Sequence, residues 1–245
     1  MIRTYSRRKK LRPKKENQSK LSQWAITFLI ENCNYDSSSI LDELKKLDHS
    51  QQATLENYAA RMLADYHLRR NEELRNGAVR LIVALLPKTF PFLEKLLSDF
   101  SIPLWYEVHF TAFSALDRSD LNKTDQKQVL ALVERYLINV SSDAGFAAWK
   151  AGDMLGDEWY AHDTVEILTR VVRSARYVAG RNGALHGIQH AMSEATPSEK
   201  ERLLSLVRKV ASEDTSAEVR DYATYTLTNG GCARHFGGHA EVKHG

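Results

Sequence analysis

Two interleaved repeats of equal length run through most of this chain. Small residues recur at Ala78, Ala112, Ala148, Ala184 and Ala223. Larger apolar residues recur between them at Leu97, Val133, Leu168 and Leu206. Both series have a period of about 36 residues, which predicts a two-helix unit that is repeated about four and a half times.

The residues around these markers have the periodicity of α-helices. Leu21, Trp24, Ala25 and Phe28 form one apolar stripe, and similar stripes follow along the chain. No segment alternates polar and apolar residues as a half-buried strand does. The sequence therefore predicts an all-α chain, with helices at 20–33, 39–47, 51–70, 72–86, 91–100, 103–116, 125–140, 143–155, 163–176, 178–193, 197–212 and 216–229.

Local signals for helix starts fall where the repeat requires them. Thr196-Pro-Ser-Glu199 has the form of a capping box with proline at the first helical position. Asp125 and Asp163 are each followed three residues later by Gln or Glu, which predicts acidic N-caps at these two positions.

A two-helix unit of this period admits tetratricopeptide, HEAT and armadillo-like arrays, and the tetratricopeptide pattern is absent. Segment 214–223, Asp-Thr-Ser-Ala-Glu-Val-Arg-Asp-Tyr-Ala, resembles the HEAT signature, in which an acid precedes Val-Arg and alanine follows three residues after the arginine. Arg75 and Arg181 have the same place relative to their alanines, whereas the other two units have His109 and Gly145 there. The resemblance covers about residues 70–230. It implies an α-α superhelix, a HEAT-like solenoid of stacked hairpins, in which Arg75, Arg181 and Arg220 join a polar ladder between repeats.

The charge is distributed unevenly along the chain. Residues 1–20 contain nine basic residues and one acid, a charge of +8, so the rest of the chain carries −5 out of the total of +3. We therefore expect a disordered basic tail at 1–18, a HEAT-like solenoid at 19–230 and a flexible C-terminal tail at 231–245. The basic tail could bind phosphates or an anionic membrane surface, or it could only keep the chain in solution.

Cysteine content and hydropathy bear on the compartment. Cys33 and Cys232 are far apart and form no disulfide framework, which favours a reducing compartment. The apolar run at 24–30 is too short for a signal peptide or a membrane span. We expect a cytoplasmic monomer.

Two groups of residues have the spacing of metal ligands. His186 and His190 are four residues apart and so share one face of a helix, but the segment lacks the glutamate of the metalloprotease motif. Cys232, His235 and His239 form a Cys-x2-His-x3-His run without a second cysteine pair. We interpret both groups as structural, and expect neither a resident metal nor a cofactor. Gly180, Gly183 and Gly187 are spaced for close helix packing rather than for phosphate binding.

Trp149-Lys-Ala-Gly-Asp153 places an indole and a carboxylate on one helix face. This pair resembles the catalytic surface of HEAT-like alkylpurine DNA glycosylases. The resemblance implies that Trp149 stacks on a substrate and that Asp153 stabilises a developing positive sugar. The acidic body argues against a DNA-binding cleft, and the ordinary alternative is a tryptophan packed against the next repeat.

The sequence favours a non-enzymatic scaffold or adaptor that binds a protein partner on a concave helical surface. Its motifs include no P-loop, dinucleotide fingerprint or nucleophile elbow. Two alternatives remain: a nucleic-acid-binding or glycosylase-like protein, and a lyase or maturation factor of the kind related to phycobilisome HEAT proteins. Trp105, Tyr106, Trp159 and Tyr160 look like exposed aromatic anchors or caps on the core. The residues expected to contact a partner are Arg80, Trp105, Trp149, Lys150 and Asp153.

Overall fold

The computed structural model describes residues 15–101, 104–141 and 145–228, and within these ranges every regular element is an α-helix. The N-terminal helices are α1 (Lys15–Glu31), α2 (Ser37–Lys45), α3 (His49–Ala64) and α4 (Tyr66–Arg69). The remaining helices are α5 (Glu72–Ala84), α6 (Phe90–Ser98), α7 (Trp105–Asp117), α8 (Lys123–Asn139), α9 (Gly145–Gly156), α10 (His162–Ser174), α11 (Val178–Glu194), α12 (Pro197–Glu213) and α13 (Ala217–Thr228). The all-α prediction is confirmed. In the described part of the chain, no helix combines the length and apolar character needed to cross a bilayer.

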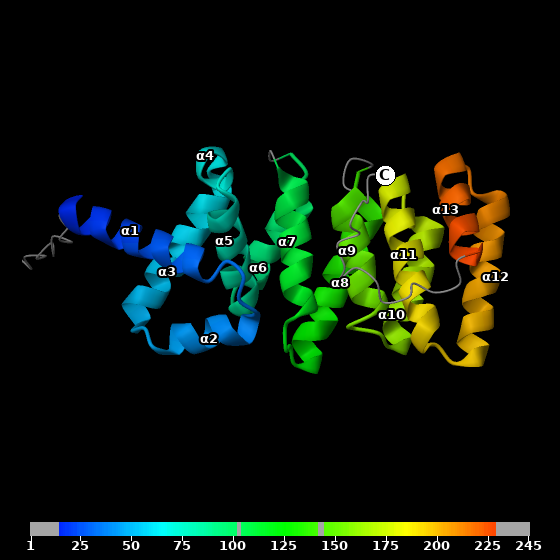
Figure 1. Cartoon of the computed structure of the whole chain (residues 1–245), viewed down its shortest axis with the longest axis horizontal. Coiled ribbons are helices and arrows are strands. Elements are labelled where there is room, and N and C mark those ends of the chain that lie inside the picture. The colour runs from blue at the N-terminus through cyan, green and yellow to red at the C-terminus, as the bar shows by residue number, and fades with distance from the viewer. Residues whose placement is uncertain (1–14, 102–103, 142–144, 229–245) are drawn as a thin grey trace, which may run out of the picture.

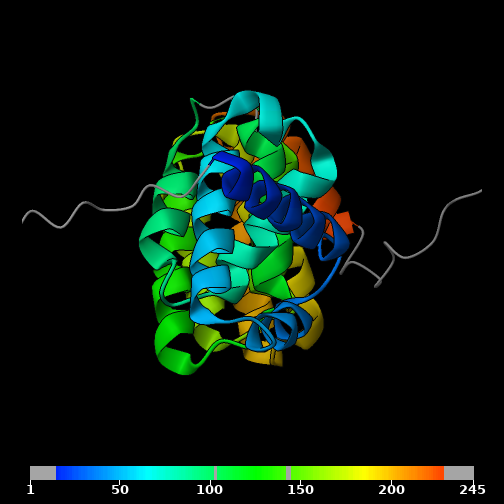
Figure 2. The same ribbon diagram turned by 90° about the vertical axis from the view of Figure 1, so that its left-hand side faces the viewer.

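The helices lie in a row along the long axis of the molecule (Figure 1). Seen along that axis, they lie behind one another (Figure 2). From α5 onward the row has two layers. In the first layer, α5, α7, α9, α11 and α13 each pack against the next. The second layer contains α6, α8, α10 and α12, which pack against first-layer helices, and within this layer α8 also packs against α6 and α10.

The residues that mark the repeat in the sequence are core residues of successive helices. The five alanines lie one on each first-layer helix and are all fully buried: Ala78, Ala112, Ala148, Ala184 and Ala223. The residues of the second series lie one on each second-layer helix and are also buried: Leu97, Val133, Leu168 and Leu206. A small residue at each first-layer position lets neighbouring helices approach closely.

The three signature arginines make the same backbone contact in their units. Arg75, Arg181 and Arg220 each donate from Nη1 to the carbonyl six residues upstream, at 3.3, 2.9 and 2.6 Å. Two of them also pair with an acid at the start of the next unit. Arg75 Nη2 lies 2.7 Å from Glu107 Oε2, and Arg181 Nε lies 3.0 Å from Asp214 Oδ2. Through these contacts the three arginines take part in helix packing, which is the structural role that the sequence predicts for them.

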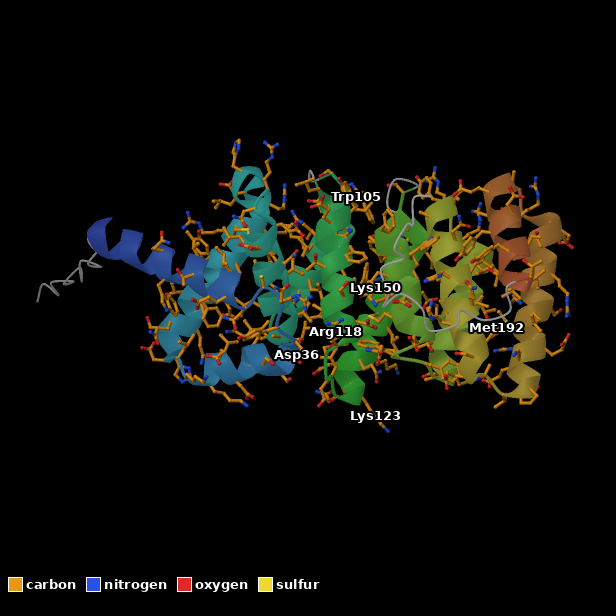
Figure 3. The ribbon with its side chains drawn as sticks, viewed as in Figure 1. Asp36, Trp105, Arg118, Lys123, Lys150 and Met192 are labelled. Atoms are coloured by element: carbon orange, nitrogen blue, oxygen red, sulfur yellow. The ribbon has the colours of Figure 1, made fainter. Side chains whose placement is uncertain are left out.

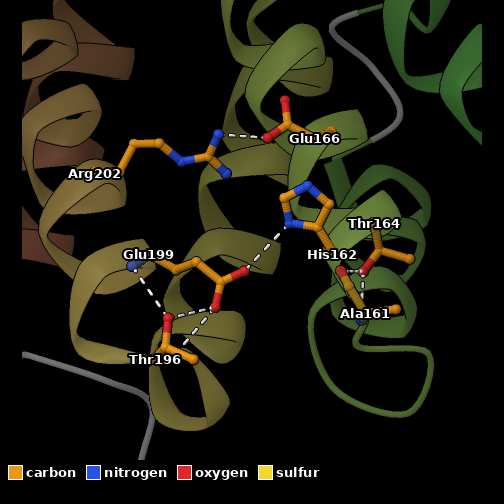
Figure 4. Close-up of polar contacts among 7 residues, drawn as sticks. All are labelled: Ala161, His162, Thr164, Glu166, Thr196, Glu199 and Arg202. Atoms are coloured by element: carbon orange, nitrogen blue, oxygen red, sulfur yellow. Dashed lines mark hydrogen bonds and ion pairs between the residues drawn. The ribbon is translucent and has the colours of Figure 1, made fainter.

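Polar contacts also join helices of the second layer (Figure 4). Arg202 on α12 pairs with Glu166 on α10, and His162 Nδ1 lies 3.4 Å from Glu199 Oε1. Glu199 belongs to the predicted capping box, in which its backbone N–H donates to Thr196 Oγ1 and its carboxylate accepts from the Thr196 backbone N–H. That helix start is confirmed.

Several predicted boundaries are wrong for identifiable reasons. The helix expected at 51–70 ends at Ala64, because Asp65 takes an extended conformation and its carboxylate caps α4. The N-cap of α8 is Asn122 rather than Asp125, since the Asn122 side chain accepts two backbone N–H groups. Asp163 lies inside the first turn of α10.

The basic tail was expected to extend to residue 18, and the structure describes α1 from Lys15 onward. Residues 1–14 and 229–245 lie outside the described residues, together with most of the basic tail and the proposed C-terminal tail at 231–245.

Candidate functional site

Helices α9 and α11 pack with their backbones in direct contact. Gly152 and Gly156 on α9 face Gly183 and Gly187 on α11, and a Cβ atom at any of the four would overlap backbone atoms of the other helix. The contact confirms that Gly183 and Gly187 serve close packing. It brings together the polar residues that flank the glycines, Asp153 beside Gly152 and His186 beside Gly187.

Asp153, His186 and His190, here called the carboxylate–histidine cluster, meet at this contact. One potential donor atom of each residue lies within 4.8 Å of those of the other two. Asp153 Oδ1 lies 3.3 Å from His190 Nε2, and the two imidazole rings meet edge to face with centroids 4.7 Å apart. The histidines share one face of α11 because they are four residues apart.

Two aromatic residues flank the cluster, one from α9 and one from α13. The indole of Trp149 stacks on the His186 ring, with centroids 4.9 Å apart and planes 15° apart. On the α13 side, the Tyr222 hydroxyl lies 3.1 Å from His186 Nδ1. The ring of His186 is therefore held by one neighbour through its face and by the other through a ring nitrogen.

Lys150 joins the cluster to α7. Its ammonium donates to Asp153 Oδ2 and to Asp117 Oδ2, at 2.6 Å in both cases, and it lies in the middle of the molecule in Figure 3. Burial alone would lower the pKa of Lys150, but its hydrogen bonds to the two carboxylates outweigh this effect and raise the pKa. Burial raises the pKa of Asp117, although Lys150 opposes the change. The bridge thus places one ammonium group between two carboxyl groups.

The protonation of His186 follows from its surroundings. Burial, with a smaller effect of the neighbouring His190, lowers the pKa of His186 to about 4. The ring is therefore neutral near pH 7, with one nitrogen protonated and the other offering a lone pair. A neutral imidazole beside a carboxylate can exchange protons, accept hydrogen bonds or coordinate a metal ion.

Two hollows open on the first layer, and Trp149 lines one of them. One, of about 380 Å³, is lined by residues of α5, α7 and α9 that include Tyr106, Phe110 and Phe146. The other, of about 250 Å³, is lined by residues of α9, α11 and α13 that include Phe146 and Trp149. Phe146 lines both hollows, so they adjoin along the layer.

Exposed aromatic side chains continue along the same layer. Tyr106 and Phe110 lie on α7, Phe146 and Trp149 on α9, and Tyr225 on α13, and each is at least 36% exposed. We call these five residues the aromatic row. Among the described residues, none of the exposed large hydrophobic side chains belongs to α6, α8, α10 or α12.

The structure brings together three of the five predicted contact residues, Trp149, Lys150 and Asp153. Arg80 lies apart from them, and it donates to the Tyr35 carbonyl at 3.1 Å and so ties α5 to the loop before α2. Trp105 had two readings, an exposed anchor or a cap on the core, and its burial agrees with the cap: it is 9% exposed because its ring packs against Phe100 and His109.

The other three aromatic residues in that group differ from one another in burial. Trp159 is buried and Tyr160 is partly buried against the core, whereas Tyr106 is exposed and belongs to the aromatic row. The sequence interpretation missed Phe110, Phe146 and the hydroxyl of Tyr222. The proposed run of Cys232, His235 and His239 lies outside the described residues.

Trp149 and Asp153, the two residues of the glycosylase resemblance, lie in a different setting from the one that the resemblance implies. Asp153 is engaged by Lys150 and lies beside His190, and Trp149 is already stacked on His186. Comparison of the chain with protein-family models, with curated proteins and with solved structures finds no match in any of the three.

Proposed function

We propose that this protein is a HEAT-like α-solenoid and a non-enzymatic interaction scaffold, which binds a protein segment along the aromatic row. The single observation that carries this proposal is that, among the described residues of α5–α13, the exposed aromatic side chains all lie on first-layer helices. Exposed apolar side chains gathered on one face mark interaction sites, because they would otherwise remain unfavourably in water. Aromatic residues also supply most binding energy in many interfaces.

Three features support the solenoid reading. The chain advances through helices that pack on their neighbours in the row. The marker residues of each unit are buried at equivalent places. Each signature arginine repeats the same contact with the carbonyl six residues upstream. Such arrays offer extended surfaces for binding.

The charge of the first layer favours a basic partner segment. Its five helices contain eight acidic and five basic residues, a net charge of −3. The second-layer helices contain eight acidic and ten basic residues, a net charge of +2. Glu72 and Glu107 line one hollow and Glu218 lines the other. We infer a segment that alternates apolar anchors with lysine or arginine.

Peptide selection tests this function directly. A random peptide library is selected on the immobilised full chain, and the affinity of enriched peptides is measured by fluorescence anisotropy. Phe146→Ala should weaken binding about 30-fold, because loss of an aromatic anchor costs about 2 kcal/mol. Its side chain is 80% exposed, so the substitution should leave folding unchanged.

Leu41→Ala is the matched control, since Leu41 is exposed on α2, outside the aromatic row. It should leave peptide affinity unchanged. Peptides that bind Phe146→Ala as tightly as the wild type would refute the proposal. Binding of a short DNA duplex that depends on Phe146 would favour the nucleic-acid alternative instead, and selective binding of a peptide with the sequence of residues 1–20 would make the chain its own ligand.

A further inference from the structure

The carboxylate–histidine cluster contains the donor set of a transition-metal site. It combines two imidazoles from α11 with one carboxylate from α9, and no aromatic row residue is needed to complete it. Imidazole nitrogen together with carboxylate oxygen suits Zn²⁺ and its neighbours in the transition series better than Mg²⁺ or Ca²⁺, which prefer oxygen alone.

The spacing of the donors fits such an ion. Zinc binds nitrogen and carboxylate oxygen at about 2.0–2.2 Å, so two donors of a tetrahedral ion lie about 3.4 Å apart. Asp153 Oδ1 and His190 Nε2 already lie 3.3 Å apart. The donor of His186 lies within 4.8 Å of both, which exceeds the separation of about 3.4 Å expected for a tetrahedral ion by at most about 1.4 Å.

The neighbours of these three residues make the hydrogen bonds that commonly orient the ligands of a metal ion. Metal-binding histidines usually form a hydrogen bond through their second ring nitrogen, which fixes the tautomer and the ring orientation. His186 Nδ1 has such a partner in the Tyr222 hydroxyl, so Nε2 is the nitrogen left for an ion. Asp153 has a partner on its other oxygen in Lys150, which leaves Oδ1 directed towards His190.

The charge and rigidity of the site agree with this reading. Asp117, Asp153 and Lys150 together carry a formal net charge of −1, so the half-buried bridge partly compensates a divalent cation despite the ammonium group nearby. The donors stand on two helices whose backbones touch at four glycines. A rigid scaffold of this kind holds ligands close to the geometry of the complex.

We propose that Asp153, His186 and His190 bind one divalent transition-metal ion of the zinc type. Three protein donors leave at least one coordination position for water or for a group of a further ligand, as in zinc sites that are open rather than purely structural. This inference is independent of the partner-binding function, because it rests on different atoms.

Titration of the metal-free full chain with Co²⁺, followed by visible absorption and by displacement with Zn²⁺, tests the proposal. The wild type should bind one equivalent with the spectrum of a site of low coordination number. Tyr222→Phe, which removes only the hydroxyl beside His186, should weaken binding about 10- to 100-fold. His190→Gln and Asp153→Asn should weaken it by at least the upper end of that range, because each removes a direct ligand. Circular dichroism confirms that each variant is folded.

Two controls locate the ion. His162→Ala removes an exposed histidine of α10 and should leave binding unchanged. The triple substitution Cys232→Ser, His235→Ala and His239→Ala removes the other ligand-like run and should also leave this spectrum unchanged. Absence of binding at millimolar Co²⁺, or binding that survives in His190→Gln and Asp153→Asn, would overturn the proposal.

Discussion

Replacing Gly152 by alanine puts the contact between α9 and α11 under a direct test. In most helices this change is favourable, since alanine is the better helix former by about 1 kcal/mol. At position 152 a methyl group would overlap the carbonyl of Gly183 and press on the amide of Gly187. Both obstacles are backbone atoms, which cannot rotate out of the way as a side chain can.

The size of the effect follows from this overlap. Non-bonded heavy atoms prefer separations of about 3.5–4.0 Å, so the two helices must move apart by about 1 Å or more. A gap of that size costs roughly a quarter to a half of the dispersion energy of the atoms involved. Overpacking of a core typically costs about 1–3 kcal/mol. Because the obstacle is rigid, we take the upper value of about 3 kcal/mol. Subtracting the gain in helix propensity of about 1 kcal/mol, we expect the free energy of unfolding to fall by about 2 kcal/mol.

Urea unfolding followed by circular dichroism measures this change. Gly145→Ala on the same helix is the matched control, because its added Cβ would meet no atom within 4 Å. That variant should be as stable as the wild type or up to about 1 kcal/mol more stable. The reasoning fails if Gly152→Ala and Gly145→Ala shift the unfolding midpoint in the same direction by similar amounts.

Three further predictions concern charges and a helix cap. Burial lowers the pKa of His109 to about 4, against about 6.5 in the unfolded chain. The unfolded state therefore binds more protons between these values, so the contribution of His109 to the free energy of unfolding is complete above pH 6.5 and falls by about 2 kcal/mol between pH 7 and pH 5. In urea unfolding, His109→Phe should lose less stability over this pH range than the wild type. An equal loss of stability in the two proteins would contradict the assignment. Arg181→Ala leaves the largely buried carboxylate of Asp214 without its cation and should cost about 3 kcal/mol in chemical unfolding, whereas a loss below about 1 kcal/mol would remove the arginine from the packing scheme. Thr196→Ala deletes the side-chain cap of α12 and should cost about 1 kcal/mol in the same assay, with Thr196→Ser restoring most of it.

The periodic part of the fold could be predicted from the sequence because buried positions recur at the same interval as the sequence repeat. Ala148 and Ala184 mark equivalent helices, and both are fully buried. What periodicity does not fix is where a helix starts. Helix α7 begins at Trp105 rather than at residue 103, and the tryptophan of its first turn packs inward while Tyr106 faces solvent. The break at Asp65 was equally hidden, because a carboxylate cap inside an apolar stripe resembles an ordinary exposed residue.

The candidate site could have been found by combining two patterns that stand apart in the sequence. Trp149 and Asp153 form one pair, and His186 and His190 form another. In the repeat, residue 184 is equivalent to residue 148, so His190 is equivalent to residue 154, one position beyond Asp153. Adjacent helices with equivalent positions side by side therefore place these residues near one another. The exact donor distances could not be anticipated, because they depend on how closely the glycines let the helices approach.

The neighbour-to-neighbour packing of the row has a consequence for how the chain opens. Helices that pack extensively are close together in the row, so the ends can fray without disrupting the middle. Amide hydrogens should then exchange with solvent in a graded order along the chain rather than all at once. The slowest exchange is expected in α9 and α11, whose backbones shield each other from water.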